Sequence, residues 1–536
     1  MRQISVDAKW RLVTDSARAE ISSPPANYSE VSLSNTDAAA PTTVAAAAPD
    51  SGRWWGLVVI ALAQLMVVLD ATIVTISLPF AQADLGISDS NRQWALTAYT
   101  LIFGGLLLLG GRLADYLGRR LMFLIGLAGF AAASALAGLA QNGAELFAGR
   151  GLQGAFAALL APAALSLLTV TFTEPKERAR AFGVFAGISA GGAALGLIVG
   201  GALTEYASWR WCLLVNTPVA ILAAIGALSV IKKDVPVART GGYDVAGAVT
   251  ATLGLVSVVY GFTRAAEAGW SAVSTVTLFA AGVVLLGAFV GIERRARNPL
   301  LPLRIPGEIN RGGSYLAALL LPIAMFAMFL FLSYYFQVTL GYTPLHAGVA
   351  FLPFPAGIMV SAAIASQLLP RVGPRPLMLT GTALGTIGLL YLAQLSLGDS
   401  YVSGVLPAQL LVALGMGQVF VAMQTTALHD VDARDAGVAS ALLNAAQQVG
   451  GSIGTALLTT VAVQVSDRYV AAHAGADQLI ARASIHSYDV AFYWGAGFFA
   501  LAFVVVAVMI TGRPDDLERG PAEESPVEPE LQPAAG

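Results

Sequence analysis

Asp70 is the residue of this chain whose type and position most clearly indicate chemistry. It is the only charged residue in an apolar run from Trp54 to Pro79. Placing a carboxylate at membrane depth costs about 2.5–3.5 kcal/mol on insertion scales, so an acidic residue there is by default a functional candidate. We predict that Asp70 binds and releases a proton. The alternative is a structural carboxylate that is permanently paired with another helix.

Arg150 is the natural partner of Asp70. At a rise of 1.5 Å per residue, Arg150 lies about 8 Å from the start of its own apolar run, and Asp70 lies about 24 Å along the first run. Because the two runs cross a core of about 30 Å in opposite directions, both residues reach a similar depth in its outer half. We expect ionised Asp70 to pair with Arg150 and protonation to release the pair. The alternative is that Arg150 extends to the outer headgroups.

Neutral amides and aromatic rings, rather than charges, mark the second half of the chain. Together they suit a large amphipathic or weakly cationic ligand. Each amide could equally make a hydrogen bond between helices. No second mid-span carboxylate is evident in this half. With one amide of the first half, the residues predicted to line a substrate cavity are Gln153, Tyr335, Gln337, Gln418, Asn444 and Gln448.

The composition places these residues in a membrane protein. The chain has 536 residues, is 56% hydrophobic and has a mean hydropathy of +0.70. Only 12% of its residues are charged, against about 25% in a soluble domain. Apolar segments long enough to cross the membrane lie at 54–79, 93–111, 121–140, 145–171, 180–204, 211–231, 243–263, 272–292, 313–337, 346–368, 376–397, 404–427, 437–464 and 489–511. We therefore predict an all-α integral membrane protein with 14 transmembrane helices.

The basic residues predict the orientation of these segments. If both termini are cytoplasmic, 24 of the 30 Lys and Arg residues lie in cytoplasmic segments and five lie outside, as the positive-inside rule requires. Residues 1–52 are polar and contain no apolar signal-peptide core, so we expect a disordered cytoplasmic tail. We also expect the acidic segment 513–536 to be disordered. The single cysteine, Cys212, and four histidines without metal spacing predict no metal site.

A charged loop follows the second apolar segment, with the sequence Gly111-Arg-Leu-Ala-Asp115-Tyr-Leu-Gly118-Arg119-Arg120. The two glycines allow a turn and close backbone approach. Asp115 can accept hydrogen bonds from a helix N-terminus or pair with an arginine, and the two terminal arginines favour the cytoplasmic side. The plainer interpretation is an ordinary charged hairpin loop.

A weaker copy of this loop, at 369–376, predicts an internal repeat. It keeps a glycine and an arginine but lacks the aspartate. The two copies divide the chain into six-helix bundles at 53–231 and 313–512, with two inserted helices and linkers at 232–312. Such paired halves are typical of alternating-access transporters.

The fifth apolar segment carries glycines that recur at intervals of four residues. They are Gly192, Gly196 and Gly200, followed by Gly201. This spacing forms a groove in which another helix can pack closely.

Taken together, these motifs resemble the major facilitator superfamily, and within it the fourteen-span drug:proton antiporters of the EmrB/QacA type. The resemblance covers about 54–512. It depends on the charged loop, on Gln93, Trp94 and Tyr99, and on the stretches 69–79, 150–154, 192–201, 209–211, 216–218, 298–304, 335–337 and 341–344. Leu197 stands where the family usually has proline, and Thr75 where it usually has asparagine.

The resemblance implies a proton-coupled efflux transporter that exports amphipathic drugs or antibiotics across the cytoplasmic membrane and confers resistance. In that family the arginine matching Arg150 is associated with proton transfer, and the glycines matching Gly192 to Gly201 with blocking leak. The implied protein works as a monomer in the lipid bilayer, uses the proton motive force without a cofactor, and has no nucleic-acid partner. The alternative is a proton-coupled symporter or a uniporter for a small nutrient. An enzyme is disfavoured, because the chain has no His-Glu-x-x-His motif. Direct use of ATP is also disfavoured, because the chain has no Gly-x-x-x-x-Gly-Lys motif.

Overall fold

A computed structural model describes residues 52–172, 174–231, 244–296, 299–431, 435–475 and 477–511. Within these ranges the chain is α-helical, with two π-helical turns and no β-strand. The tails predicted at 1–52 and 513–536 lie outside the described residues, apart from Gly52.

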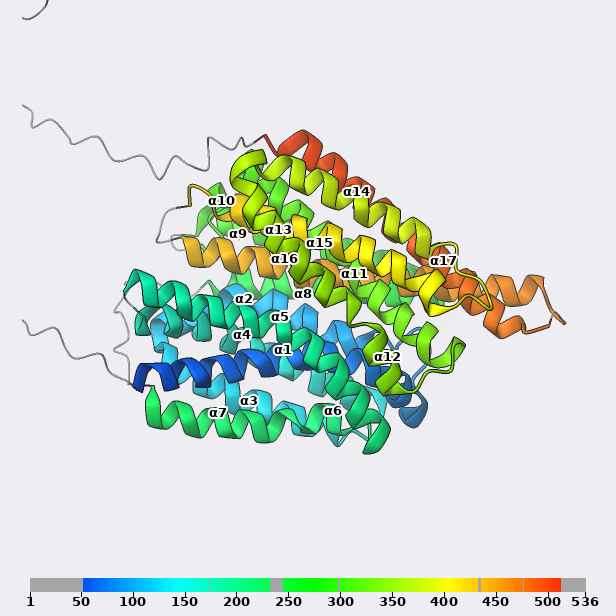
Figure 1. The fold of residues 1–536 in the computed structure, drawn as a ribbon, viewed down its shortest axis with the longest axis horizontal. Helices are drawn as coiled ribbons and strands as arrows, with labels where there is room; N and C mark the ends of the chain where they lie inside the picture. Colours follow the sequence, from blue (N-terminus) through cyan, green and yellow to red (C-terminus); the bar gives the residue numbers. More distant parts are fainter. Residues whose placement is uncertain are drawn as a thin grey trace, which may run out of the picture. The chain divides into compact units, whose positions relative to one another are not determined.

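Figure 1 shows the helices in chain order. They are α1 (Gly52–Leu85), α2 (Trp94–Leu117), α3 (Arg119–Gly138), α4 (Gly143–Thr171), α5 (Pro175–Tyr206), α6 (Trp211–Leu214), α7 (Asn216–Val230), α8 (Val245–Ala268), α9 (Val273–Arg295), α10 (Arg304–Gly307), α11 (Ile309–Tyr334), η2 (Tyr335–Thr339), α12 (Pro344–Ala350), α13 (Pro353–Val372), α14 (Pro374–Leu392), η3 (Tyr401–Val405), α15 (Leu406–Leu428), α16 (Ala436–Ala472) and α17 (Leu479–Met509).

Twelve helical segments of the described residues are long and apolar enough to cross a membrane, so the chain is a multi-pass membrane protein. Two further long helices, α5 and α14, lie where the segments 180–204 and 376–397 were predicted. The largest differences from prediction occur in the last two helices. α16 runs on to Ala472 and α17 begins at Leu479, ten residues before the predicted start of the last segment.

Local sequence explains where several helices begin. The Asn142 side chain accepts a hydrogen bond from the backbone N–H of Glu145 at 3.0 Å and so caps α4. The Glu145 carboxylate accepts the Gln141 N–H at 2.8 Å in return. Gly118, between α2 and α3, and Gly373, between α13 and α14, have φ angles of +101° and +78°, which favour glycine. These two glycines occupy matching places in the charged loop and its weaker copy.

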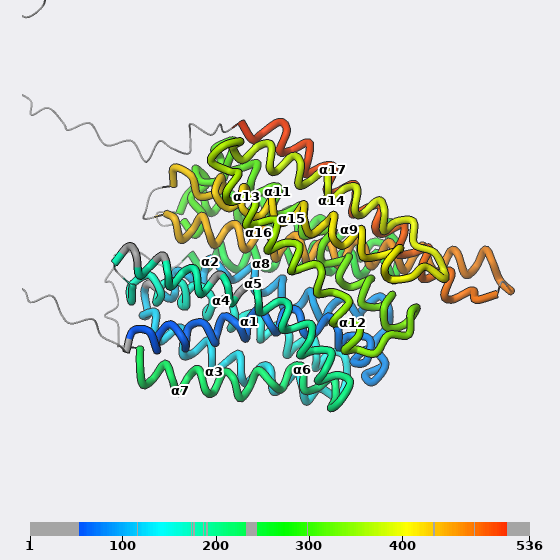
Figure 2. The backbone as a smooth tube through the Cα atoms, viewed as in Figure 1, coloured from blue at the N-terminus to red at the C-terminus, as the bar shows by residue number. Residues whose placement is uncertain are grey.

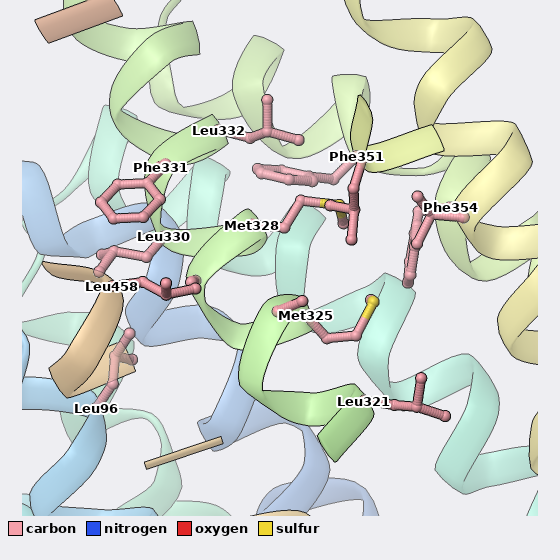
Figure 3. Packing of buried hydrophobic residues seen from close by; sticks show 14 of the residues in the cluster. Leu96, Leu321, Met325, Met328, Leu330, Phe331, Leu332, Phe351, Phe354 and Leu458 are labelled. Carbon is pink, nitrogen blue, oxygen red and sulfur yellow. The ribbon is translucent and has the colours of Figure 1, made fainter. Parts of the chain in front are cut away.

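The buried apolar residues form two main clusters. One contains residues of α1, α2, α3, α4, α5 and α7, with Ala445 of α16 as its member from the second half. Figure 2 shows α1, α3 and α7 of this group side by side. The larger cluster joins the second-half helices and also includes Ile73 and Ile76 of α1. In Figure 3, Met325 and Met328 of α11 point toward the phenylalanines that follow α12. One end of α1 is therefore packed into the core of the second half.

Polar contacts join the two halves at that same end of α1. The Ser333 hydroxyl donates to the carbonyl oxygen of Thr75 at 2.8 Å, and Gln337 Nε2 donates to the carbonyl oxygen of Ile76 at 3.1 Å. The N–H of Leu345 donates to Glu205 Oε2 at 3.0 Å. These bonds join α1 and α5 of the first half to the α11–α12 region of the second.

The helix α8 contacts both halves. Gln93 Nε2, at the start of α2, donates to Thr263 Oγ1 at 2.9 Å. Thr460 of α16 donates to the carbonyl oxygen of Phe262 at 2.9 Å, and Gln464 Nε2 donates to that of Ala265 at 3.0 Å. The pair α8–α9 is thus attached to α2 and α16, one helix from each half.

We predict that Gly110→Ala destabilises the protein. A Cβ atom at Gly110 of α2 would lie 1.9 Å from the carbonyl oxygen of Ala158 in α4, so the two helices would have to separate. We expect a loss of about 1–3 kcal/mol, the usual effect of overpacking, measured as a lower unfolding temperature in detergent. Gly287→Ala in α9 is the matched control because its Cβ would meet nothing within 4 Å. Equal unfolding temperatures for Gly110→Ala and the wild type would contradict this packing.

Candidate functional site

Asp70 lies at the centre of a buried polar network in the first half. It is the nineteenth residue of α1, and its side chain is fully buried. Asp70 Oδ2 accepts a hydrogen bond from Arg150 Nη1 of α4 at 2.6 Å. Asp70 Oδ1 accepts from Asn216 Nδ2 of α7 at 2.7 Å and from Gln153 Nε2 of α4 at 3.0 Å. Three donors from two helices therefore hold the carboxylate.

Arg150 is 1% exposed, and its guanidinium points into the bundle. It donates through Nε to the carbonyl oxygen of Ala95 in α2 at 2.9 Å and through Nη1 to Gln153 Oε1 at 2.8 Å. Its Cζ lies 4.5 Å from the centroid of the Tyr99 ring, within the range of a cation–π contact. The predicted pairing with Asp70 is confirmed in geometry, and the alternative of an arginine at the headgroups is wrong for this structure.

The amides orient the ion pair. Gln153 lies one turn after Arg150, as the spacing predicted. Its Nε2 donates to both Asp70 and the Ser134 hydroxyl of α3, the latter at 2.6 Å, while its Oε1 accepts from Arg150. Helices α1, α2, α3, α4 and α7 all contribute a group to this site.

This arrangement is matched to an ionised carboxylate. Nη1 of Arg150 and the amide nitrogens of Gln153 and Asn216 can only donate, and they point at the two oxygens of Asp70. A proton on Oδ1 would displace Gln153 or Asn216, and a proton on Oδ2 would remove the negative charge that faces the Arg150 guanidinium. Because the groups are buried, the bonds are electrostatically stronger than in water. Protonating Asp70 must weaken its hold on α4 or α7.

Sequence reasoning did not select three of these groups. Asn216 belongs to a stretch that carries the family resemblance, and it is a polar residue at the start of an otherwise apolar helix. Tyr99 belongs to the second apolar segment and Ser134 to the third. Asn216 carried a usable signal, because a polar amide in an apolar span is costly unless it finds a partner. Tyr99 also belongs to the residues that carry the family resemblance, although no role was assigned to it. Ser134 carried no signal that separates it from ordinary span residues.

The prediction of a loop at 111–120 is wrong, because residues 111–117 continue α2 and Arg119 and Arg120 already belong to α3. The arginines of this charged stretch fix it to other elements. Arg112 Nη2 donates to the carbonyl oxygen of Pro299 at 2.9 Å, and Arg120 Nη2 donates to that of Leu228, in α7, at 2.8 Å. A Cβ atom at Gly111 would lie 3.7 Å from Pro162 of α4. Gly118 makes the turn, and Arg119 begins α3. The side chain of Asp115 lies outside the described part, so its predicted role stays a prediction.

The glycines of α5 contact two different helices. Cβ atoms at Gly192, Gly196 and Gly200 would lie 3.0 Å or less from side-chain atoms of α1, including 2.0 Å from Thr72 Oγ1 at Gly196. A Cβ at Gly201 would instead lie 2.6 Å from the backbone of α12 in the second half. The series therefore packs α5 on α1, and its last member packs against α12.

The residues predicted to line a cavity lie in several places. Gln153 belongs to the Asp70 network. Gln337 contacts the α1 backbone, and Gln418 Oε1 accepts from the Thr380 hydroxyl of α14 at 2.7 Å. Asn444 is exposed and donates to its own helix at Ser440. In addition, Tyr335 is buried at 1% exposure in the second-half core, and Gln448 lies beside Gly104 of α2. Their role in binding stays a prediction.

Comparison with known proteins gives the family. Residues 60–455 match the Major Facilitator Superfamily. The chain belongs to this family. It is 47% identical over 485 residues to the puromycin resistance protein of Streptomyces alboniger, covering 90% of this chain and 96% of that protein. It is 38% identical over 410 residues to the cephamycin export protein of Amycolatopsis lactamdurans, covering 76% and 84%.

A solved structure has the same fold. It is a bacterial homologue of the human lysosomal transporter Spinster in an inward-facing and occupied conformation. The TM-score is 0.65 at 14% identity, over 87% of this chain and 98% of that chain. This likeness shows the fold alone. With the family match and the apolar helices, it makes the chain a multi-pass transporter of the cell membrane.

We predict that Asn216→Ala destabilises the protein by about 1.5–3 kcal/mol, the usual value of a hydrogen bond to a charged group. The change removes the 2.7 Å bond to Asp70 and leaves that oxygen with Gln153 alone. The measurement is the unfolding temperature of the purified protein in detergent. Asn444→Ala is the matched control, because that amide is exposed and bonds only within α16. An equal effect of the two substitutions would contradict the network.

Proposed function

We propose that this chain is a proton-coupled antiporter that exports amphipathic drugs or antibiotics across the cytoplasmic membrane and so confers resistance. The observation that carries the proposal is the fully buried Asp70–Arg150 pair, with the donor network around it. A carboxylate at membrane depth is an expected carrier of protons. Because the donors around Asp70 belong to α4 and α7, binding of a proton to Asp70 changes the hydrogen bonds that α1 makes with these two helices.

The relatives support the drug class. The puromycin resistance and cephamycin export proteins are matched over most of their length. Related chains also include a multidrug efflux pump of Mycolicibacterium smegmatis, at 32% identity. Because the relative that shares 47% identity with this chain is named for puromycin resistance, we propose puromycin as the first substrate to test.

We propose fourteen spans with both termini in the cytoplasm. Besides the twelve candidate spans, α5 has 32 residues and α14 has 19 residues, each long enough to cross a core of about 30 Å. The excess of arginine and lysine in alternate loops supports the orientation. We further propose that α1–α7 and α11–α17 form the two bundles, that α8–α9 are the insertion, and that a monomer works in the bilayer on the proton motive force without a cofactor.

With this orientation, the contacts between the halves lie at the outer side. The bonds of Ser333 and Gln337 to α1, and of Leu345 to Glu205, then close the outer end of the transporter. Alternating access requires these bonds to break when substrate leaves. Asp70 lies five residues before Thr75 on α1, so a change at the ion pair can reach this closure through one rigid helix.

We predict that Asp70→Asn abolishes the uphill transport of puromycin by a pH gradient. An asparagine cannot carry the coupling proton, although it preserves the shape of the site. The measurement is puromycin uptake into inside-out proteoliposomes that are acidic inside. Asp477→Asn, a matched change at an exposed residue, should transport like the wild type.

Puromycin exchange without a pH gradient provides the folding control for Asp70→Asn. We expect exchange to persist, because it needs alternating access but no net proton movement. Gradient-driven accumulation by Asp70→Asn at the wild-type level would refute Asp70 as the coupling residue. A wild type that moves no puromycin under any gradient would refute this substrate.

A further inference from the structure

Two carboxyl groups meet at one end of the α8–α9 hairpin. Asp244 caps the start of α8, and Glu293 lies in the last turn of α9. A Cβ atom at Gly247 would lie 2.6 Å from Asp244 Oδ2 and 2.9 Å from Glu293 Oε1. The two oxygens can therefore be no further apart than the sum of these distances, 5.5 Å. They converge on the space that glycine leaves in the first turn of α8.

Each carboxyl group is held by one backbone N–H and has its other oxygen without a partner. The N–H of Gly247 donates to Asp244 Oδ1 at 2.7 Å, and the N–H of Leu301 donates to Glu293 Oε2 at 3.0 Å. Asp244 Oδ2 and Glu293 Oε1, the two oxygens that converge, are buried and have no hydrogen-bond partner. Glu293 as a whole is only 4% exposed. A buried carboxylate oxygen that has no donor is costly when it is charged.

The charges around this pair leave one carboxylate unbalanced. Helices α2, α9 and α16 pack against α8. From α2, Arg112 donates to the carbonyl oxygen of Pro299 at 2.9 Å and acts electrostatically on Glu293. The arginines of α9, Arg294 and Arg295, are exposed, and α8 and α16 carry their other described charges near their far ends. Of the described cations, Arg112 therefore faces two carboxyl groups and can balance the charge of one.

A single proton fits this arrangement. Two carboxylates that share one buried site repel each other, so that one of them takes up a proton. A proton on Glu293 Oε1 forms an O–H that Asp244 Oδ2 accepts, or the reverse, and all four oxygens then have a partner. Magnesium and calcium ions require about six or more oxygen ligands. The described residues contain no group of three His, Cys, Asp or Glu side chains that could hold a metal ion.

We propose that Asp244 and Glu293 bind one proton between them and so join the start of α8 to the end of α9. Glu293 also holds the backbone of Leu301, in the connection that Arg112 fixes to α2. Loss of the shared proton leaves two facing charges, which separate α9 and this connection from α8. In the orientation proposed above, this end of the hairpin is cytoplasmic, so the insertion responds to an alkaline cytoplasm. The shared proton itself does not depend on that orientation or on drug transport.

The test is the infrared spectrum of the purified protein in detergent, from mildly acidic to alkaline pH. A protonated carboxyl group has a C=O stretching band that an ionised carboxylate lacks. We expect the wild type to keep one such band well above pH 4, where free carboxyl groups are about half ionised, and Glu293→Gln and Asp244→Asn both to lose it. Because each amide places an N–H where the shared proton lies, both variants should fold. Glu267→Gln, the same change at an exposed residue of α8, should keep the band.

The pH dependence of unfolding is a second measurement of the same proton. A native protein that holds one more proton than the unfolded chain becomes less stable as the pH rises. Relative to Glu293→Gln, the unfolding equilibrium constant of the wild type should increase by up to about tenfold per pH unit until the shared proton is lost. Glu267→Gln should follow the wild type.

Each outcome has a distinct meaning. Equal carboxyl bands and parallel pH dependence in the wild type and both amide variants overturn the proposal. A band that is lost only in Glu293→Gln assigns the proton to Glu293 alone and overturns its sharing with Asp244. If neither amide variant folds while Glu267→Gln does, both charges are required and the proposal is wrong. Stabilisation of the wild type, but not of Glu293→Gln, by magnesium or calcium chloride would assign the pair to a cation instead.

Discussion

The ion pair between Asp70 and Arg150 is the interaction on which the first half of the structure depends. Both side chains are removed from water, and the pair contributes one negative and one positive charge to an otherwise apolar bundle. A buried pair adds little net stability, but removing one partner typically costs about 3–5 kcal/mol, because the other charge is left uncompensated. The network around it therefore has to satisfy every donor and acceptor while the carboxylate is ionised.

Close helix packing makes this network possible. Arg150 reaches the carbonyl oxygen of Ala95 because α2 and α4 approach each other closely, with Gly154 of α4 placed so that a Cβ would lie 2.3 Å from the carbonyl oxygen of Tyr99. The α5 glycines hold the opposite side of α1. Because α1 is packed on several sides, it moves as a rigid element. A change in the charge of Asp70 can therefore affect the contacts at the far end of α1. At its far end, α1 accepts the hydrogen bonds of Ser333 and Gln337 from the second half.

The sequence was sufficient for much of this description. Asp70 was identifiable because a lone carboxylate in an apolar run has few physical explanations, and helix geometry placed Arg150 at the same depth. Asn216 and Ser134 could not be assigned, because which helices become neighbours depends on tertiary packing. The start of α17 was predicted ten residues too late, because polar residues in its first turns, such as Arg482 and His486, interrupt the apolar pattern. The cavity residues were the least predictable, since an amide in a span serves equally well as a ligand or as an interhelical contact.

Proton release on substrate binding tests the central claim most directly. Purified wild-type protein in weakly buffered detergent solution is mixed with puromycin near neutral pH, and a pH indicator dye records released protons. If Asp70 exchanges its proton for substrate, the wild type releases protons in proportion to bound puromycin, and Asp70→Asn releases fewer per molecule bound. Equal release from both proteins, with equal binding, would contradict the account and make the Asp70–Arg150 pair a structural element.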